Sequence, residues 1–321
     1  MTPDDGLALR YNSPALNAGD PMANPSLFPG GPDHPLDLAG LPRFDNRIDM
    51  GAYEYKDVCI DINRVVYVDS AAVTGTNDGT SWDNAFTDLQ DALRRAWECP
   101  DKVDTILVAV GTYFPTTSMD RTLSFDIPSG VVILGGFSPL NGITTPGQRD
   151  WRIYETVLSG NIGMVDNSDN SYHVVTTLHV DSTTIVDGFT ISDGNADGSG
   201  PYGSGGGWYN DGSGIGNHSN PTIRNCKFYF NRADLGGAML NFGEMGGNSS
   251  PTLLDCEFIE NGAVISGGAI ANRATNGYSS PELINYVFVH NNTGVNSGAI
   301  LNYGAEGTSS PIMTICLFQG S

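Results

Sequence analysis

Acidic side chains gather in the middle of the sequence, and they are the first residues that could do chemistry. Polysaccharide lyases combine acidic Ca²⁺ ligands with a basic residue that removes a proton beside a uronate carboxylate, and glycoside hydrolases use paired carboxylates. The acids are Asp181, Asp187, Asp193, Asp197 and Asp211. The basic residues near them are His173, His179, His218, Arg224, Lys227 and Arg232. No further motif of either enzyme class accompanies them, so we predict no catalytic residue in this chain.

The loop Gly188–Gly207 offers two candidate binding sites. Asp193, Asn195 and Asp197 alternate along it, and hard cations such as Ca²⁺ take oxygen ligands of this kind, although the bidentate Glu of an EF-hand is absent. These three residues are therefore a candidate calcium site. Trp208 and Tyr209 follow the loop and could stack on a neutral sugar. We favour the alternative that they pack beneath the glycine-rich loop.

These candidates lie beside an internal repeat of about 30 residues, the strongest signal in the sequence. Pro221, Pro251, Pro281 and Pro311 are each 30 residues apart and open the segments NPTIRNCKFYFN, SPTLLDCEFIEN, SPELINYVFVHN and SPIMTICLFQGS. Between them lies a second block, at Gly236–Asn241, Gly267–Asn272 and Ser297–Asn302, with a looser copy at Gly205–Asn210.

Apolar residues alternate within each copy, which predicts short strands with one buried face. Gly, Asn and Ser separate the strands as turns. Each unit is then one coil of an all-β parallel solenoid, and equivalent side chains stack on one another from coil to coil. The predicted inward ladders are Phe228, Phe258, Phe288 and Phe318; Cys226, Cys256 and Cys316; and Asn231, Asn261 and Asn291.

Upstream of the regular repeats, irregular coils and a cap are expected. Strand candidates are Asp104–Tyr113, Thr122–Ile127, Val131–Phe137, Thr156–Gly160, Tyr172–Thr177 and Ile185–Ser192, for roughly seven coils in all. Before them, Phe86, Leu89, Leu93 and Ala96 share one helical face and predict a helix that plugs the open end of the stack. The expected organisation is residues 1–57 as the tail of a preceding unit, 58–103 as strand and cap, and 104–321 as truncated coils.

Composition narrows the range of partners. Acidic residues outnumber basic ones 36 to 15, for a net charge of −21, so a nucleic-acid partner is disfavoured. No stretch approaches the roughly 20 apolar residues of a transmembrane helix. Cys59 and Cys99 flank the predicted cap and are candidates for a disulfide.

The repeats resemble those of the chlamydial polymorphic membrane proteins, whose FxxN and GGAI motifs stand here as FYFN at Phe228, FIEN at Phe258, FVHN at Phe288 and GGAI at Gly267–Ile270. The opening YVDSAAVTGTNDGTSW and the N-terminal NSPALNAGDP resemble the opening and closing segments of secreted bacterial β-helix proteins. The resemblance implies a right-handed parallel β-helix of the pectin-lyase-like kind. It also implies export to the cell surface by a signal outside this sequence.

We therefore expect a secreted or surface-displayed β-helix segment of a large adhesin-like or structural protein, monomeric within a longer polypeptide and non-catalytic. Its partner would be a host or neighbouring-cell surface, or a polysaccharide. The alternative is a polysaccharide-processing or carbohydrate-binding β-helix. Three or more acids meeting a Lys, Arg or His in one groove would favour an enzyme, and a smooth Ser, Thr and Asn face would favour a binding or structural role.

Overall fold

The computed structural model describes Cys59 and residues 64–163, 166–295 and 298–320. Within these residues the chain forms a parallel β-helix of about seven turns, as the repeats predict. The coils belong to a unit that begins at residue 63. The predicted tail at residues 1–57 lies outside the described residues. Among those described, no helix is long and apolar enough to span a membrane.

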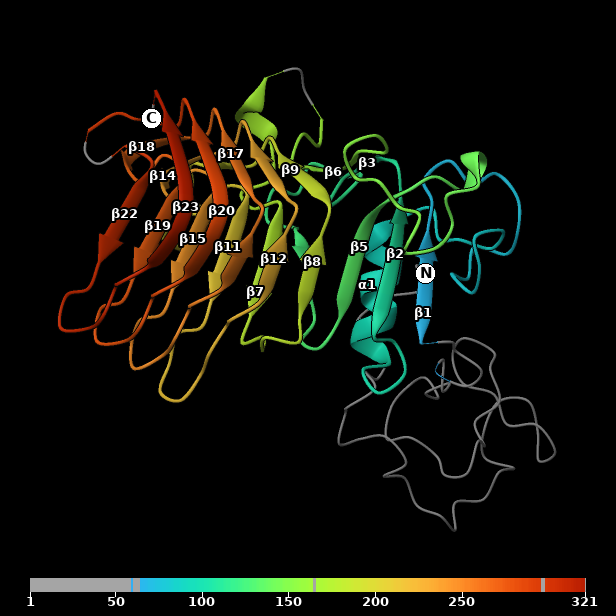
Figure 1. Cartoon of the computed structure of the whole chain (residues 1–321), viewed down its shortest axis with the longest axis horizontal. Helices are drawn as coiled ribbons and strands as arrows, with labels where there is room; N and C mark the ends of the chain where they lie inside the picture. Colours follow the sequence, from blue (N-terminus) through green and yellow to red (C-terminus); the bar gives the residue numbers. More distant parts are fainter. Residues whose placement is uncertain (1–58, 60–63, 164–165, 296–297, 321) are drawn as a thin grey trace, which may run out of the picture. The chain divides into compact units, whose positions relative to one another are not determined.

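Three parallel sheets run along the coil axis (Figure 1). The largest contains β1 (Val65–Val68), β2 (Thr105–Ala109), β3 (Gly111–Tyr113), β5 (Val132–Phe137), β6 (Thr156–Ser159), β8 (Ile185–Asp187), β9 (Phe189–Ser192), β12 (Thr222–Arg224), β13 (Lys227–Tyr229), β16 (Thr252–Leu254), β17 (Glu257–Ile259), β20 (Glu282–Val289) and β23 (Ile312–Gln319). A second sheet contains β4 (Phe125–Asp126), β7 (Val175–Leu178), β11 (Trp208–Asp211), β15 (Met239–Phe242), β19 (Ile270–Arg273) and β22 (Ile300–Tyr303). The third contains β10 (Asn195–Ala196), β14 (Arg232–Leu235), β18 (Gly262–Ser266) and β21 (Asn292–Thr293).

The strands pair in the register that the repeat requires. Phe228 of β13 lies opposite Phe258 of β17, and Phe258 lies opposite Phe288 of β20. Their rings stack with centroids 4.8 and 4.9 Å apart, and Phe318 continues the stack at 4.9 Å. Because Phe228, Phe258 and Phe288 are fully buried, this ladder forms the core of the regular coils.

Two ladders of asparagine amides run beside the phenylalanines. In the predicted ladder, the Nδ2 group of Asn231 donates to Oδ1 of Asn261 at 3.0 Å, and that of Asn261 donates to Asn291 at 2.9 Å. The same Oδ1 atoms accept backbone N–H groups of the preceding coil, for example from Asn231 N to Asn261 Oδ1 at 3.1 Å. The amides thus satisfy backbone groups that the turns bury away from water.

The second ladder runs through Asn210, Asn241, Asn272 and Asn302, where each Nδ2 donates to the next Oδ1 at 2.8–3.0 Å. In the sequence, this second ladder is marked by the asparagine that ends every GGAI-type block. We had interpreted those blocks only as close-packed strands. The repeat therefore carries one more inter-coil interaction than predicted.

The predicted helix is α1 (Leu89–Glu98), the only α-helix in the described part of the chain. Asp88 caps its N-terminus by accepting from the backbone N–H of Gln90 at 2.9 Å. Its apolar face, with Leu89, Leu93 and Ala96, is buried, and the helix contacts β1 and β4. This is the location expected of a cap on the first coil.

Replacing Phe258 by Asp should cost at least about 4 kcal/mol of unfolding free energy, because it puts an unpaired charge inside the ring stack. Phe230→Asp, in the preceding copy of the repeat, is the control, since Phe230 is exposed. Urea unfolding of both variants is the measurement. A Phe258→Asp variant as stable as the control would contradict the ladder.

Candidate functional site

A polar pocket of about 300 Å³ lies on the outer side of the largest sheet. Four successive coils line it at one corner. They contribute residues before β6, between β8 and β9, between β12 and β13, and around the start of β17. The lining residues include Trp151, Arg152, Glu155, Gly188, Thr190, Asn225, Lys227, Asp255 and Glu257.

The corner itself comes from a backbone feature of the repeat. Asn225, Asp255 and Asn285 each precede the Cys or Tyr of the ladder, and each has a positive φ of 53–54°. Asn and Asp tolerate this left-handed conformation better than other non-glycine residues. The bend separates β12 from β13 and β16 from β17, and it places Asn225 and Asp255 in the pocket wall.

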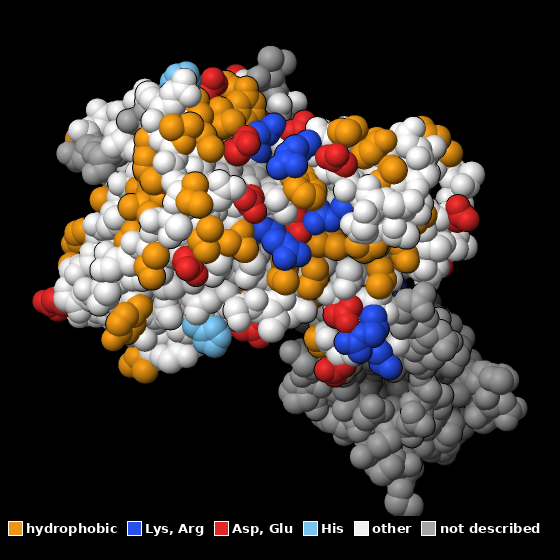
Figure 2. Space-filling view, in the orientation of Figure 1, with side chains coloured by type: hydrophobic (Ala, Val, Ile, Leu, Met, Phe, Trp, Pro, Cys, Tyr) orange, Lys and Arg blue, Asp and Glu red, His pale blue; other side chains and the backbone are white. Residues whose placement is uncertain are grey.

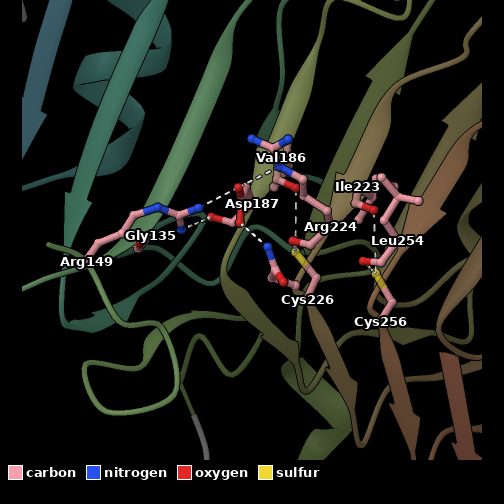
Figure 3. A network of polar contacts seen from close by, with 10 residues as sticks. Gly135, Arg149, Val186, Asp187, Ile223, Arg224, Cys226, Leu254 and Cys256 are labelled. Atoms are coloured by element: carbon pink, nitrogen blue, oxygen red, sulfur yellow. Dashed lines mark hydrogen bonds and ion pairs between the residues drawn. The ribbon is translucent and has the colours of Figure 1, made fainter. Parts of the chain in front are cut away.

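A buried carboxylate, that of Asp187, holds together residues next to the pocket (Figure 3). Asp187 accepts from Arg149 Nη2 at 2.5 Å and from Arg224 Nε at 2.6 Å, and its other oxygen accepts from Asn225 Nδ2 at 2.8 Å. The side chain of Asp187 is 1% exposed and that of Arg149 is 9% exposed. Two guanidinium groups therefore share one desolvated carboxylate, so each of the three charges depends on the others.

Trp151 lines the pocket beside this network. The guanidinium carbon of Arg149 lies 4.9 Å from the centre of its ring, and that of Arg152 lies 5.2 Å away. Gly188 has a φ of +85°, and a Cβ atom there would meet Arg149 Nη1 at 2.8 Å and Trp151 Cβ at 3.0 Å. A glycine at this position lets the segment that carries Trp151 approach the sheet closely.

Glu155 and Lys227 form an ion pair in the pocket, with Lys227 Nζ 2.6 Å from Glu155 Oε1. Thr190 Oγ1 donates to the same oxygen at 2.6 Å. The hydrogen bond from Lys227, followed by that from Thr190, lowers the pKa of Glu155 below its ordinary value. Glu155 is therefore ionised at neutral pH and is not poised as a general acid.

Acidic and basic side chains lie together on one face of the molecule. Figure 2 shows Lys and Arg side chains interspersed with Asp and Glu in the region where Figure 1 places β6, β8 and β9. The pocket brings three acids, Glu155, Asp255 and Glu257, together with Arg152 and Lys227. Acids and basic residues meeting in one groove are the combination expected of a polysaccharide-processing enzyme and not of a smooth scaffold.

The five sequence-predicted acids do not share this site. Asp187 is held by its two arginines, whereas Asp181 accepts from Thr183 N at 2.8 Å and Asp211 from Ser213 N at 2.8 Å. Asp193 and Asp197 lie in the loop, each with partners of its own. Of the predicted basic residues, Lys227 lines the pocket, and Arg224 pairs with Asp187 beside it.

The candidate calcium ligands are already engaged with protein groups. Asp193 Oδ2 accepts from Ser159 Oγ at 2.9 Å and from Ser192 Oγ at 2.6 Å. Asp197 is paired with Arg121 at 2.6 Å, and Asn195 Nδ2 donates to it at 3.1 Å. Within residues 64–163, 166–295 and 298–320, no three His, Cys, Asp or Glu side chains are grouped to hold a metal. A calcium ion at this loop stays a prediction.

Of the two sugar-stacking candidates, Trp208 is fully buried. Its Nε1 donates to Thr177 Oγ1 at 2.8 Å, and Thr177 in turn donates to Asn210 of the second ladder at 2.8 Å. Its ring therefore packs in the core and offers no face to a sugar. Tyr209 points to the other side of the strand and is half-buried.

The cysteines divide into two groups. Cys226, Cys256 and Cys316 are free thiols, and the first two are buried, with burial raising the pKa of the Cys226 thiol to about 12. The ladder is interrupted by Tyr286, which lies opposite Cys316. Cys59 and Cys99 are both buried and neither is a free thiol. Their pairing with each other stays a prediction.

The sequence analysis missed Trp151, Arg152, Glu155, Asp255 and Glu257. Asn225, Lys227, Asp255 and Glu257 stand on either side of Cys226 and Cys256, at positions that alternation points outward. That signal could have located half of the pocket. Trp151 and Glu155 lie in an irregular segment, where no periodicity indicates the direction of a side chain.

Asp187→Asn should lower the unfolding free energy by about 3–5 kcal/mol, because it leaves Arg149 buried without a countercharge. Asp181→Asn, at an exposed carboxylate, is the control and should cost about 1 kcal/mol or less. Urea unfolding measures both, and amide exchange should rise across residues 145–155 in the first variant alone. Equal stability of the two variants would refute the network.

His173 makes stability depend on pH. Burial lowers its pKa from 6.5 to about 4, while its Nδ1 lies 3.0 Å from the carbonyl of Gly205. The unfolded chain therefore takes up a proton first, and up to about 3 kcal/mol present above pH 6.5 is lost as the pH falls to about 4. The difference in unfolding free energy between the wild type and His173→Phe should follow this curve. A difference independent of pH would contradict the assignment.

Comparison with known proteins adds no relative. No family model matches the chain. Neither the curated proteins nor the solved structures contain a match. The chain is a parallel β-helix whose function must be argued from its own residues.

Proposed function

We propose that this chain is a non-catalytic β-helix of a secreted or surface-displayed, adhesin-like protein and that its pocket binds a neutral polysaccharide. The single observation that carries the proposal is the polar pocket bounded by Trp151, Lys227 and Glu257. It unites an aromatic ring with donors and acceptors of both charges, which is what a surface needs to hold a sugar by its hydroxyl groups and its apolar face.

Each group has a defined task in this proposal. Carboxylates at Asp255 and Glu257 accept hydrogen bonds from hydroxyl groups, and Asn225 and Lys227 donate to sugar oxygens. Trp151 supplies an apolar surface for the sugar ring. Through Asn225 and Arg149, the Asp187 network holds part of the pocket wall and Trp151 in place before the ligand arrives, which lowers the entropy cost of binding.

The balance of charge favours a neutral ligand. Three carboxylates face two cations in the pocket, and one of the cations, Lys227, is already paired with Glu155. The chain as a whole carries a net charge of −21. A polyanionic glycan would approach against this field, whereas a neutral one would not.

Ion pairing also favours binding over turnover. A glycosidase needs a carboxyl group that stays protonated, and a lyase needs a basic side chain without its proton. Glu155 has a lowered pKa and Lys227 donates to it. Glu155 is therefore not poised as a general acid, and Lys227 is engaged in an ion pair with it.

A polysaccharide hydrolase or lyase is the second candidate, and Asp255 and Glu257 favour it because two exposed carboxylates face one pocket. Export, display on the bacterial surface and attachment to a neighbouring or host cell are the remaining parts of the proposal. A rigid stack of coils suits that role, because it carries a binding surface at a fixed place along an extended body.

Titration calorimetry with neutral oligosaccharides is expected to detect binding, and Trp151→Ala is expected to weaken it roughly tenfold or more through loss of the sugar platform. Trp97→Ala, which removes an exposed indole from α1, is the control and should bind like wild type. Binding that Trp151→Ala leaves unchanged would place the site elsewhere.

Incubation with neutral and uronic-acid polysaccharides, with and without Ca²⁺, separates the two candidates. The proposal expects no new reducing ends and no unsaturated product. If the wild type forms product and Asp255→Asn or Glu257→Gln does not, the pocket is a catalytic site and the non-catalytic proposal is wrong.

A further inference from the structure

A second ligand-binding surface lies on the six-stranded sheet, away from the pocket. The outward residues of neighbouring strands stand in register there: Leu178 of β7, Asp211 of β11, Phe242 of β15, Arg273 of β19 and Tyr303 of β22. Figure 1 shows these strands stacked along the axis of the helix. The row therefore crosses successive coils at the strand spacing of about 4.8 Å.

Two of these five residues, Phe242 and Tyr303, are aromatic, and further rings continue from Phe242. The ring of Tyr209 lies 6.2 Å from that of Phe242, and His173 lies 5.0 Å from Tyr209. Tyr202 follows at 6.0 Å from His173 and is partly exposed. At the other end Tyr303 is 48% exposed. We call Tyr202, Tyr209, Phe242, Arg273 and Tyr303 the aromatic row.

Its members are held in place by one another. The guanidinium carbon of Arg273 lies 5.6 Å from the centre of the Phe242 ring. Arg273 Nη2 lies 2.9 Å from Glu244 Oε1, and Thr275 Oγ1 donates to the same oxygen at 2.9 Å. The arginine is thus a flat extension of the aromatic surface and not a free charge.

The other charges beside the row are also engaged. Arg121 stacks 4.2 Å from the Tyr172 ring and pairs with Asp197. Asp211 accepts from Ser213 N. The surface therefore offers partly exposed aromatic rings edged by polar groups that pair with one another, and both arginines beside the row, Arg121 and Arg273, already have an acidic partner.

We propose that the aromatic row binds a neutral, unbranched polysaccharide laid along the axis of the β-helix. Sugar rings present flat C–H faces that pack on aromatic side chains, and their hydroxyl groups hydrogen-bond to the paired charges at the edges. From β11 to β22 the row spans three strand steps, about 14 Å, so it contacts several consecutive sugars and not a single terminal one.

This surface is separate from the pocket proposed above. The pocket lies on the largest sheet, and the two surfaces share no residue. The two proposals can therefore fail independently. Together they would give the chain two points of attachment to one polymer network, which raises avidity without new contacts at either point.

Affinity electrophoresis through gels containing hydroxyethylcellulose, glucomannan or dextran is the test, with polygalacturonate as the acidic counterpart. Tyr303→Leu and Phe242→Leu keep apolar bulk but remove the ring, and each should weaken retention by a neutral polymer roughly threefold to tenfold. Tyr303→Phe should restore wild-type retention. Leu178→Ala, in the same register without a ring, should behave like wild type.

Trp151→Ala distinguishes the two surfaces. If the aromatic row binds the polysaccharide, the Trp151→Ala variant should still show the part of the gel retention that Phe242→Leu removes. If Tyr303→Leu and Phe242→Leu are both retained like the wild type, the aromatic row does not bind the polymer. Retention of the wild type by polygalacturonate alone would also contradict the proposal. A dimer seen by analytical ultracentrifugation that Tyr303→Leu dissolves would also overturn it, because the row would then be an interface between copies of this chain. Thermal melting confirms that each variant is folded.

Discussion

Every coil of this β-helix depends on its neighbours to satisfy the backbone groups that its turns bury. In the regular coils, the ladder of Asn231, Asn261 and Asn291 meets that requirement. Each amide of Asn231 and Asn261 donates to the next coil, and each Oδ1 accepts a backbone N–H group from the coil before. Removing one rung would leave buried donors and acceptors unpaired on both sides. The phenylalanine stack fills the space between the ladders, so polar satisfaction and apolar packing share one repeat.

The same constraint explains where ligand chemistry can reside. Inward positions are committed to Phe, Cys and Asn, and the turns to Gly and Asn. Only outward positions are free to differ between coils, as at Lys227 and Glu257, which lie opposite each other in β13 and β17. A site can then form wherever an irregular segment folds back over such positions. The segment with Arg149, Trp151 and Glu155 does this, and Asp187 anchors it with a buried charge.

The sequence predicted the architecture well because stacking makes equivalent residues repeat. Periods at Pro221, Phe228 and Asn231 located strands, core and turns, and the helical face at Leu89 located the cap. It predicted the pocket poorly. Trp208 repeats the pattern of an inward position, so its burial follows from alternation, whereas Trp151 belongs to no repeat. Asp187 is one of several similar aspartates in the sequence, and only the fold distinguishes it by bringing Arg149 and Arg224 to it.

Hydrogen–deuterium exchange with a bound neutral oligosaccharide tests the central claim most directly. The bound oligosaccharide should slow exchange in four segments that are remote in sequence: 151–155, 188–190, 225–227 and 255–257. A longer polymer should add protection around Tyr209, Phe242 and Tyr303, and α1 should be unaffected in either case. Protection confined to other segments, or none at saturating ligand, would contradict the claim that this corner of the β-helix is a polysaccharide-binding site.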